Sequence, residues 1–205
     1  MQVKDVEPVH CYAFTMGHVI DISQSMDTID QPGRYLLYRN SGKQLQVWSE
    51  YMPCSEGRAM CICSVEVHLL DDVFYLHKCG RSRYAGSGNF GQRHKALPQM
   101  AVHGTSSRKR LQVLESRQGK LITVVADTGA RVRIRLEDWG LSVSVVDGQV
   151  SPEARTTAID GLCNAANQQI PVTLSVDHLP IENSLCTCSP TDQVYLTNAI
   201  SNNPK

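Results

Sequence analysis

Apolar and polar residues alternate along most of this chain, with the period of two that is typical of strands with one buried and one solvated face. The alternation predicts strands over residues 34–38, 45–49, 65–69, 73–76, 121–125, 132–136 and 141–145. Asp71-Asp72 separates two of these segments and predicts a hairpin. The last three segments follow one another closely and predict an antiparallel meander. Arginines alternate with apolar residues in 132–136, so one face of that strand is expected to be solvated.

Helical periodicity is nearly absent, apart from a short candidate helix near 152–157. We therefore predict an all-β protein whose antiparallel strands form two sheets packed as a sandwich with disulfides. The expected core residues are Leu37, Val47, Val67, Phe74, Leu76, Val124, Ile134, Val143 and Val145. No segment approaches 18 consecutive apolar residues, so no membrane span is expected.

Residues 80–110 depart from this alternation. The stretch is rich in Gly, Ser and Gln, and it predicts only one short strand, at 99–103. Its basic residues include Arg93, Lys95, Arg108, Lys109 and Arg110. A solvated loop is the simpler interpretation. The alternative is that the basic loop 93–110 binds heparin or another acidic polysaccharide, because clustered cations attract anionic partners.

The charges of the whole chain balance. It has 205 residues with 20 basic and 20 acidic side chains, so its formal net charge is zero. This balance gives no argument for nucleic acid or an anionic membrane as a partner. It also removes repulsion between copies near pH 7, which leaves a homo-oligomer open.

Eight cysteines provide the main clue to the compartment: Cys11, Cys54, Cys61, Cys63, Cys79, Cys163, Cys186 and Cys188. An even number near loops and strand ends favours disulfides and an oxidising, extracellular location. Buried free thiols and a cytosolic zinc site are the alternatives, although Cys-x-Cys lacks the usual spacing of zinc ligands. Cys63 begins one arm of the hairpin at Asp71-Asp72 and Cys79 ends the other. Folding about that turn brings them nearly opposite, which predicts a disulfide.

Asp127-Thr128-Gly129-Ala130 matches the signature of retroviral-type aspartic proteases, in which two aspartates share one proton. With one copy in the chain, Asp127 would have to act in a homodimer. Asp-Thr-Gly is also a common hairpin turn, because Asp bonds to nearby backbone and Gly adopts a positive φ. The alternating strands on either side favour the turn. We therefore expect no enzymatic activity.

Three segments, in order, resemble the von Willebrand factor type D domain. Residues 6–17 resemble its opening Gly-Asp-Pro-His segment, and residues 31–39 resemble its Pro-Gly-x-Tyr-x-Leu-Tyr-Arg strand. Residues 132–143, followed by Gly161-Leu162-Cys163, are similar to its closing strands and Gly-Leu-Cys-Gly signature. The segment from Cys61 to Phe74 is most similar to the von Willebrand factor D and EGF domain-containing proteins.

The resemblance implies one β domain over residues 1–185, followed by a C-terminal tail over 186–205. It implies a local Cys54–Cys61 bridge. It also implies that Cys163 pairs with the first strand, hence with Cys11. Cys186 and Cys188 stay unassigned.

The resemblance further implies a secreted, non-catalytic module that binds another extracellular protein or itself, as in matrix assembly. Two departures from the family pattern limit what carries over. Glu7-Pro8 stands where self-cleaving members have Asp-Pro, so we expect no autoproteolysis. Residues 163–171 lack the carboxylates with which many members bind calcium, so we expect no metal and no cofactor.

Overall fold

The computed structural model describes residues 7–54, 59–79, 99–104, 110–116, 118–138, 140–148 and 150–164. All of them lie in the first of two units, Met1–Thr173. Cys186, Cys188 and the rest of the expected tail lie outside the described residues. The domain boundary at residue 185 therefore stays a prediction.

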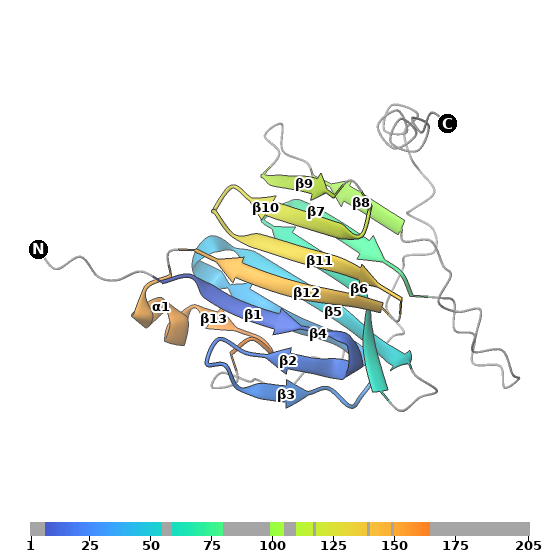
Figure 1. Ribbon diagram of the computed structural model, residues 1–205. Helices are drawn as coiled ribbons and strands as arrows, with labels where there is room; N and C mark the ends of the chain where they lie inside the picture. Colours follow the sequence, from blue (N-terminus) through green and yellow to red (C-terminus); the bar gives the residue numbers. More distant parts are fainter. Residues whose placement is uncertain are drawn as a thin grey trace, which may run out of the picture. The chain divides into compact units, whose positions relative to one another are not determined.

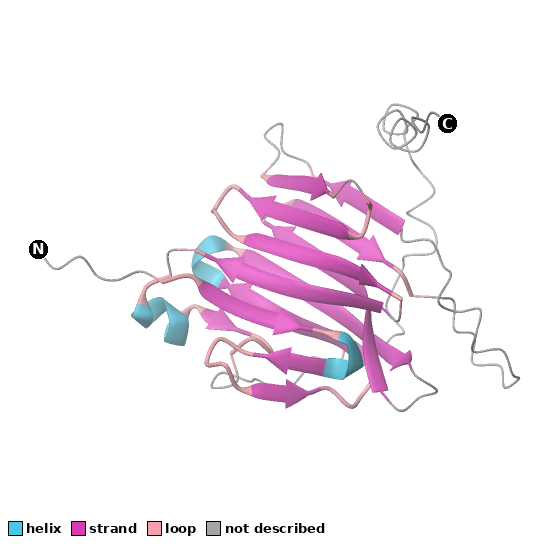
Figure 2. Cartoon of the chain, in the orientation of Figure 1, coloured by secondary structure: helices cyan, strands magenta, loops and turns pink. Residues whose placement is uncertain are grey.

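The described chain is mostly β-structure with little helix, as predicted (Figure 2). Its strands are β1 (Val9–Ala13), β2 (His18–Ile20), β3 (Met26–Thr28), β4 (Gly33–Asn40), β5 (Leu45–Cys54), β6 (Ala59–Leu69), β7 (Asp72–His77), β8 (Gln99–His103), β9 (Leu111–Glu115), β10 (Leu121–Ala126), β11 (Arg131–Glu137), β12 (Gly140–Asp147) and β13 (Ile159–Asp160). Two short 3₁₀ helices, η1 (Thr15–Gly17) and η2 (Ser41–Lys43), lie at strand ends.

The predicted helix is present as α1 (Pro152–Thr157). Ser151 caps its N-terminus, because its hydroxyl accepts a hydrogen bond from the Ala154 amide at 3.2 Å. Pro152 follows at the first helical position, where a missing N–H is tolerated. No helix among the described residues is long and apolar enough to cross a membrane.

The strands form one antiparallel sheet that curls back on itself (Figure 1). We call the run β13-β4-β5-β6-β7-β8 the β5 arm, and the run β9-β10-β11-β12-β1-β2-β3 the β11 arm. The two arms join where β6 meets β12 at the pair Ile62–Leu141. The antiparallel pairing agrees with the prediction.

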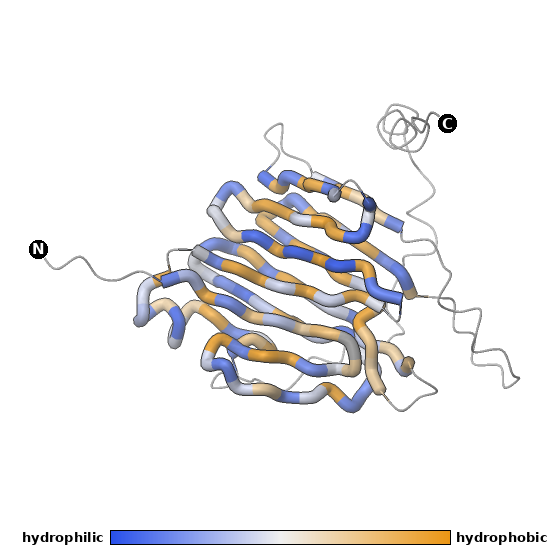
Figure 3. The backbone as a smooth tube through the Cα atoms, in the orientation of Figure 1, coloured by the Kyte–Doolittle hydropathy of each residue, from blue (hydrophilic) through white to orange (hydrophobic). Residues whose placement is uncertain are grey.

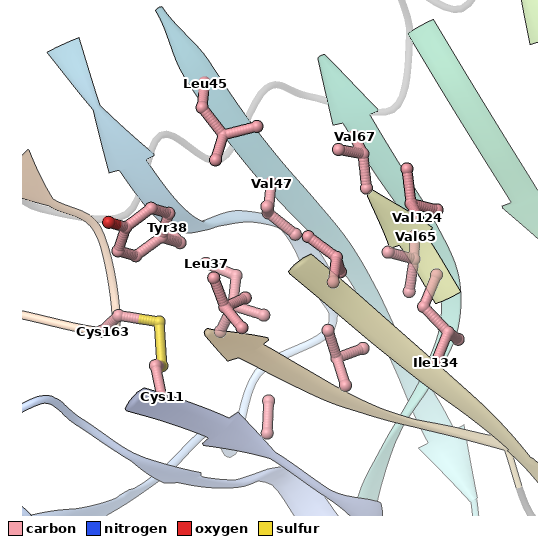
Figure 4. Packing of buried hydrophobic residues seen from close by; sticks show 14 of the residues in the cluster. Cys11, Leu37, Tyr38, Leu45, Val47, Val65, Val67, Val124, Ile134 and Cys163 are labelled. Atoms are coloured by element: carbon pink, nitrogen blue, oxygen red, sulfur yellow. A yellow bond between two sulfur atoms is a disulfide. The ribbon is translucent and has the colours of Figure 1, made fainter. Parts of the chain in front are cut away.

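The core lies between the two arms, and Figure 4 shows side chains of β4 to β6 packing against Val124 and Ile134 of the β11 arm. All nine residues predicted for the core are at most 2% exposed. A bulge in β4, where the register with β5 shifts between Leu36 and Tyr38, adds to this core. It allows the consecutive residues Leu37 and Tyr38 to be fully buried, which strict alternation would forbid.

Three disulfides anchor the sheet. They join Cys11 to Cys163, Cys54 to Cys61 and Cys63 to Cys79, with Cα–Cα distances of 5.6, 5.7 and 4.7 Å. These are the three pairs that the sequence analysis expects. The first is fully buried and ties β1 to the segment that follows β13 (Figure 4).

A buried carboxylate also links the arms. Asp147, at the end of β12, is fully buried. It accepts hydrogen bonds from Tyr38 Oη at 2.7 Å and Asn40 Nδ2 at 2.8 Å, and it pairs with the Lys43 ammonium group. Burial raises the pKa of the Tyr38 hydroxyl, and the negative charge of Asp147 raises it further. This hydroxyl therefore stays protonated and donates. Every polar contact in this network crosses from the β5 arm to the β11 arm.

Candidate functional site

The Asp127 motif lies on an exposed hairpin turn between β10 and β11. The Gly129 amide bonds the Ala126 carbonyl at 2.9 Å, and Gly129 has a φ of 86°, as the turn interpretation requires. The Asp127 carboxylate is about half exposed and lies 3.5 Å from Arg110 Nη1. The predicted turn is confirmed, and nothing in the described geometry brings a second carboxylate to Asp127.

The candidate polysaccharide loop is described only in part. Arg93, Lys95, Arg108 and Lys109 lie outside the described residues. Arg110 precedes β9 and is the partner of Asp127, so its charge is partly compensated. The loop hypothesis therefore stays a prediction.

The outer face of the β5 arm carries a cluster that sequence reasoning missed. We call it the β5 face and define it by Arg34, Trp48, Glu50, Glu66, His68, Tyr75 and His77. Each of these side chains is partly buried and alternates with a core position of its strand. Strand register places Trp48, Glu66 and Tyr75 side by side across β5, β6 and β7.

Arg34 is the centre of this face. Its guanidinium carbon lies 4.6 Å above the centroid of the Trp48 ring, which is a cation–π contact. Its Nη2 also donates to Glu66 Oε2 at 2.7 Å. Glu66 Oε2 in turn lies 2.8 Å from His68 Nε2. These contacts hold the long Arg34 and Trp48 side chains in one arrangement before any partner binds.

The electrostatics of the face follow from this packing. Burial alone would raise the pKa of Glu66, but its bonds to His68 and Arg34 outweigh burial and hold that pKa below its usual value. Burial raises the pKa of Glu50, and the negative charge of Glu66 raises it further, whereas the positive charge of Arg34 lowers it. Glu66 therefore carries the negative charge that balances Arg34, while the charged form of Glu50 is less favourable than that of a carboxyl group in water.

A second pair lies at the β7 side of the face. Tyr75 Oη and His77 Nδ1 are 2.8 Å apart, and the two rings stack with centroids separated by 5.7 Å. Burial raises the pKa of Tyr75 and lowers the pKa of His77, the latter partly offset by a hydrogen bond with the Cys79 backbone. The neutral forms of both groups are favoured.

The lowered pKa of His77 predicts a pH effect on stability. As the pH falls below about 6.5, the unfolded chain takes up a proton at this residue more readily than the folded chain. The free energy of unfolding should therefore decrease on acidification, and His77→Gln should remove that contribution. Urea titrations at pH 7.5 and pH 5.5 test this, with His103→Gln on exposed β8 as the matched control. Glu50 acts in the opposite direction but is common to all three proteins. An unchanged pH dependence in His77→Gln would contradict the assignment.

One group of candidate metal ligands occurs within the described residues: Glu50, Cys63 and Cys79, whose ligand atoms lie within 4.8 Å of one another. The two sulfur atoms are bonded to each other, so neither is a thiolate that could hold a metal ion. Of the segment 164–171, in which many members of the resembled family bind calcium, the structure describes Asn164, whose side-chain amide donates to the carbonyls of Arg155 and Ile159. Residues 165–171 lie outside the residues that the structure describes.

No protein-family model matches this chain. The fold and the β5 face therefore provide the evidence on function. The β5 face has a preorganised aromatic and charged surface, held on a sheet crosslinked by disulfides. This arrangement is suited to binding a partner.

Proposed function

We propose that this chain is a non-catalytic extracellular module that binds protein through the β5 face, with a second copy of the chain as its first partner. The observation that carries the proposal is the Arg34–Trp48–Glu66 cluster on the outer face of a rigid sheet. Trp, Tyr and Arg are the residues enriched in the energetically dominant contacts of protein interfaces. Their prior ordering reduces the entropy lost on binding.

The proposal includes the finer fold, a two-sheet sandwich of the von Willebrand type D kind, in which the two arms would be the packed sheets. Two disulfides implied by that resemblance, Cys54–Cys61 and Cys11–Cys163, support it. Three disulfides also support an oxidising, extracellular location. The zero net charge supports association between copies, since no long-range repulsion opposes it.

Trp48→Ala tests this proposal. Sedimentation equilibrium at pH 7.4 should show concentration-dependent dimers of the natural sequence. Trp48→Ala should weaken the dimer by about 2 kcal/mol, or roughly 30-fold in Kd, because it removes both an aromatic contact and the surface on which Arg34 rests. Tyr12→Ala, a partly buried aromatic on the outer face of the β11 arm, is the matched control and should leave the dimer unchanged. A monomer at every concentration, or equal effects of both variants, would exclude self-association through this face.

A further inference from the structure

The outer face of the β11 arm carries a row of exposed arginines. Arg131, Arg133 and Arg135 occupy alternate positions of β11, while Val132 and Ile134 between them are 2% and 0% exposed. With a rise of about 3.4 Å per residue, neighbouring arginines start about 7 Å apart and the row is about 14 Å long. Figure 3 shows the alternation as hydrophilic segments along β11.

Hydroxyl side chains flank the centre of the row and one side of Arg135. Arg133 lies between Thr123 of β10 and Ser144 of β12, and Arg135 lies opposite Ser142. The other neighbours of the row in register are aliphatic. All three arginines are exposed, so their guanidinium groups are accessible to a partner.

Two of these arginines differ in their pairing from the other arginines that the structure describes. Arg34, Arg39, Arg110 and Arg155 each have a carboxylate oxygen within 4.0 Å. In the row, Arg135 has one at 3.9 Å, from Glu137. Arg131 and Arg133 have none among the described residues. Two uncompensated positive charges, at Arg131 and Arg133, thus lie on one face of a chain whose net charge is zero.

An aromatic pair lies on the same face. Tyr12 of β1 is opposite Ser144, and His10 is opposite Val146. The two rings stack, with centroids 6.4 Å apart. With strands about 4.8 Å apart, β1 lies about 10 Å from β11, so the rings border the arginine row at the distance of two strands.

We propose that this face, defined by Arg131, Arg133 and Arg135 with Tyr12 and His10 at its border, binds a sulfated glycosaminoglycan chain. A guanidinium group forms two parallel hydrogen bonds with a sulfate, and a straight row of them matches the repeated anionic groups of an extended polymer. The hydroxyls and the amphipathic aromatic rings beside the row suit the hydroxyl-bearing, partly apolar surface of a sugar. An acidic peptide would use the charges but not this border.

This inference goes beyond the proposed protein binding and uses the outer face of the other arm, although both require an extracellular location. It also differs from the polysaccharide hypothesis for loop 93–110. The experiment must therefore separate three sites on one chain.

Heparin affinity of the full chain tests the proposal. The natural sequence should stay on immobilised heparin at physiological salt, about 0.15 M. The triple substitution of Arg131, Arg133 and Arg135 by serine should raise the Kd for heparin by at least about tenfold, since it removes three charge-assisted contacts. The matched control replaces Arg108, Lys109 and Arg110 by serine, which removes the same charge from the loop, and it should change the Kd by less than about twofold.

The possible outcomes differ clearly. Loss of binding only in the β11 variant supports the proposal. Loss only in the loop variant assigns the site to the loop and overturns the proposal. Equal losses in the two variants show that net charge alone is responsible and overturn it as well. Failure of the natural sequence to bind heparin, or equally tight binding of desulfated heparin, polyglutamate or duplex DNA, also overturns it. Circular dichroism checks the fold, and Arg133→Glu replaces the triple variant if that variant is unfolded.

Two further measurements keep this proposal separate from the previous one. Trp48→Ala should bind heparin as the natural sequence does, and the β11 variant should retain the dimer in sedimentation equilibrium. A chain that dimerises without binding heparin would contradict this inference alone. A chain that binds heparin but never dimerises would contradict self-association alone.

Discussion

Replacing both Cys11 and Cys163 by alanine should lower the free energy of unfolding by about 5 kcal/mol, because this bond crosslinks residues 152 positions apart and so restricts the unfolded chain strongly. Both sulfur atoms also belong to the core. The bond ties the segment after β13 to β1, and the Cys163 amide of the same segment donates to the Leu37 carbonyl of β4 at 2.8 Å. Loss of the bond should therefore loosen β13 as well.

Urea unfolding of the purified variants measures this effect. The matched control is the double alanine variant of Cys54 and Cys61, which are also buried but only seven positions apart. Its expected loss is about 2.5 kcal/mol, because a short loop has little entropy to lose. A thiol titration of the native protein beforehand should find these four cysteines unreactive. Equal losses in the two variants, or reactive thiols in a folded chain, would contradict the role assigned to the long crosslink.

The second large effect is expected at Asp147. Asp147→Ala should lower the free energy of unfolding by about 3–5 kcal/mol, because it removes the carboxylate of a buried charged network and leaves the Lys43 charge uncompensated. The Lys43 ammonium group, in a side chain 21% exposed, would lose its counter-ion. The hydroxyl of Tyr38, whose side chain is fully buried, would lose its acceptor.

Asp160→Ala is the control for this prediction. Asp160 pairs with Arg39, but the two side chains are 26% and 42% exposed. The loss there should be about 1 kcal/mol or less, since water replaces a partner at the surface. Asp147→Asn should fall between the two, because an amide keeps an acceptor for Tyr38 but not the charge. Similar losses for both alanine variants would show that burial of Asp147 adds nothing to its contribution.

The sequence predicted the central strands and the core well, because period two is a local property. Val132 to Leu136 shows which residues are inward without knowledge of any neighbour. The shortest strands were missed for the same reason: β2 and β3 have three residues each, too few to establish a period, and β1 was expected only from the family resemblance. The bulge at Leu36–Tyr38 breaks the alternation and is invisible until the register with β5 is known.

The β5 face and the arginine row of β11 both depend on the register between strands, and so does the Asp147 network. Lys43 and Asp147 are 104 positions apart, and no local pattern connects them. Aromatic residues at solvent-facing strand positions, such as Trp48 and Tyr75, were the available signal for the β5 face. The arginines of β11 were recognised as a solvated face, but only the folded sheet shows that Arg135 has a carboxylate within 4.0 Å and that Arg131 and Arg133 have none among the described residues.

The Cys11–Cys163 crosslink has a mechanical consequence. Tension applied to the chain on either side of this bond passes from one sulfur atom to the other and bypasses the residues between them. Nearly every strand of the sheet is enclosed in that unloaded segment. Under stretching, the outer faces of both arms therefore keep their shape for as long as the bond is oxidised, and a reductant would make the same surfaces sensitive to force.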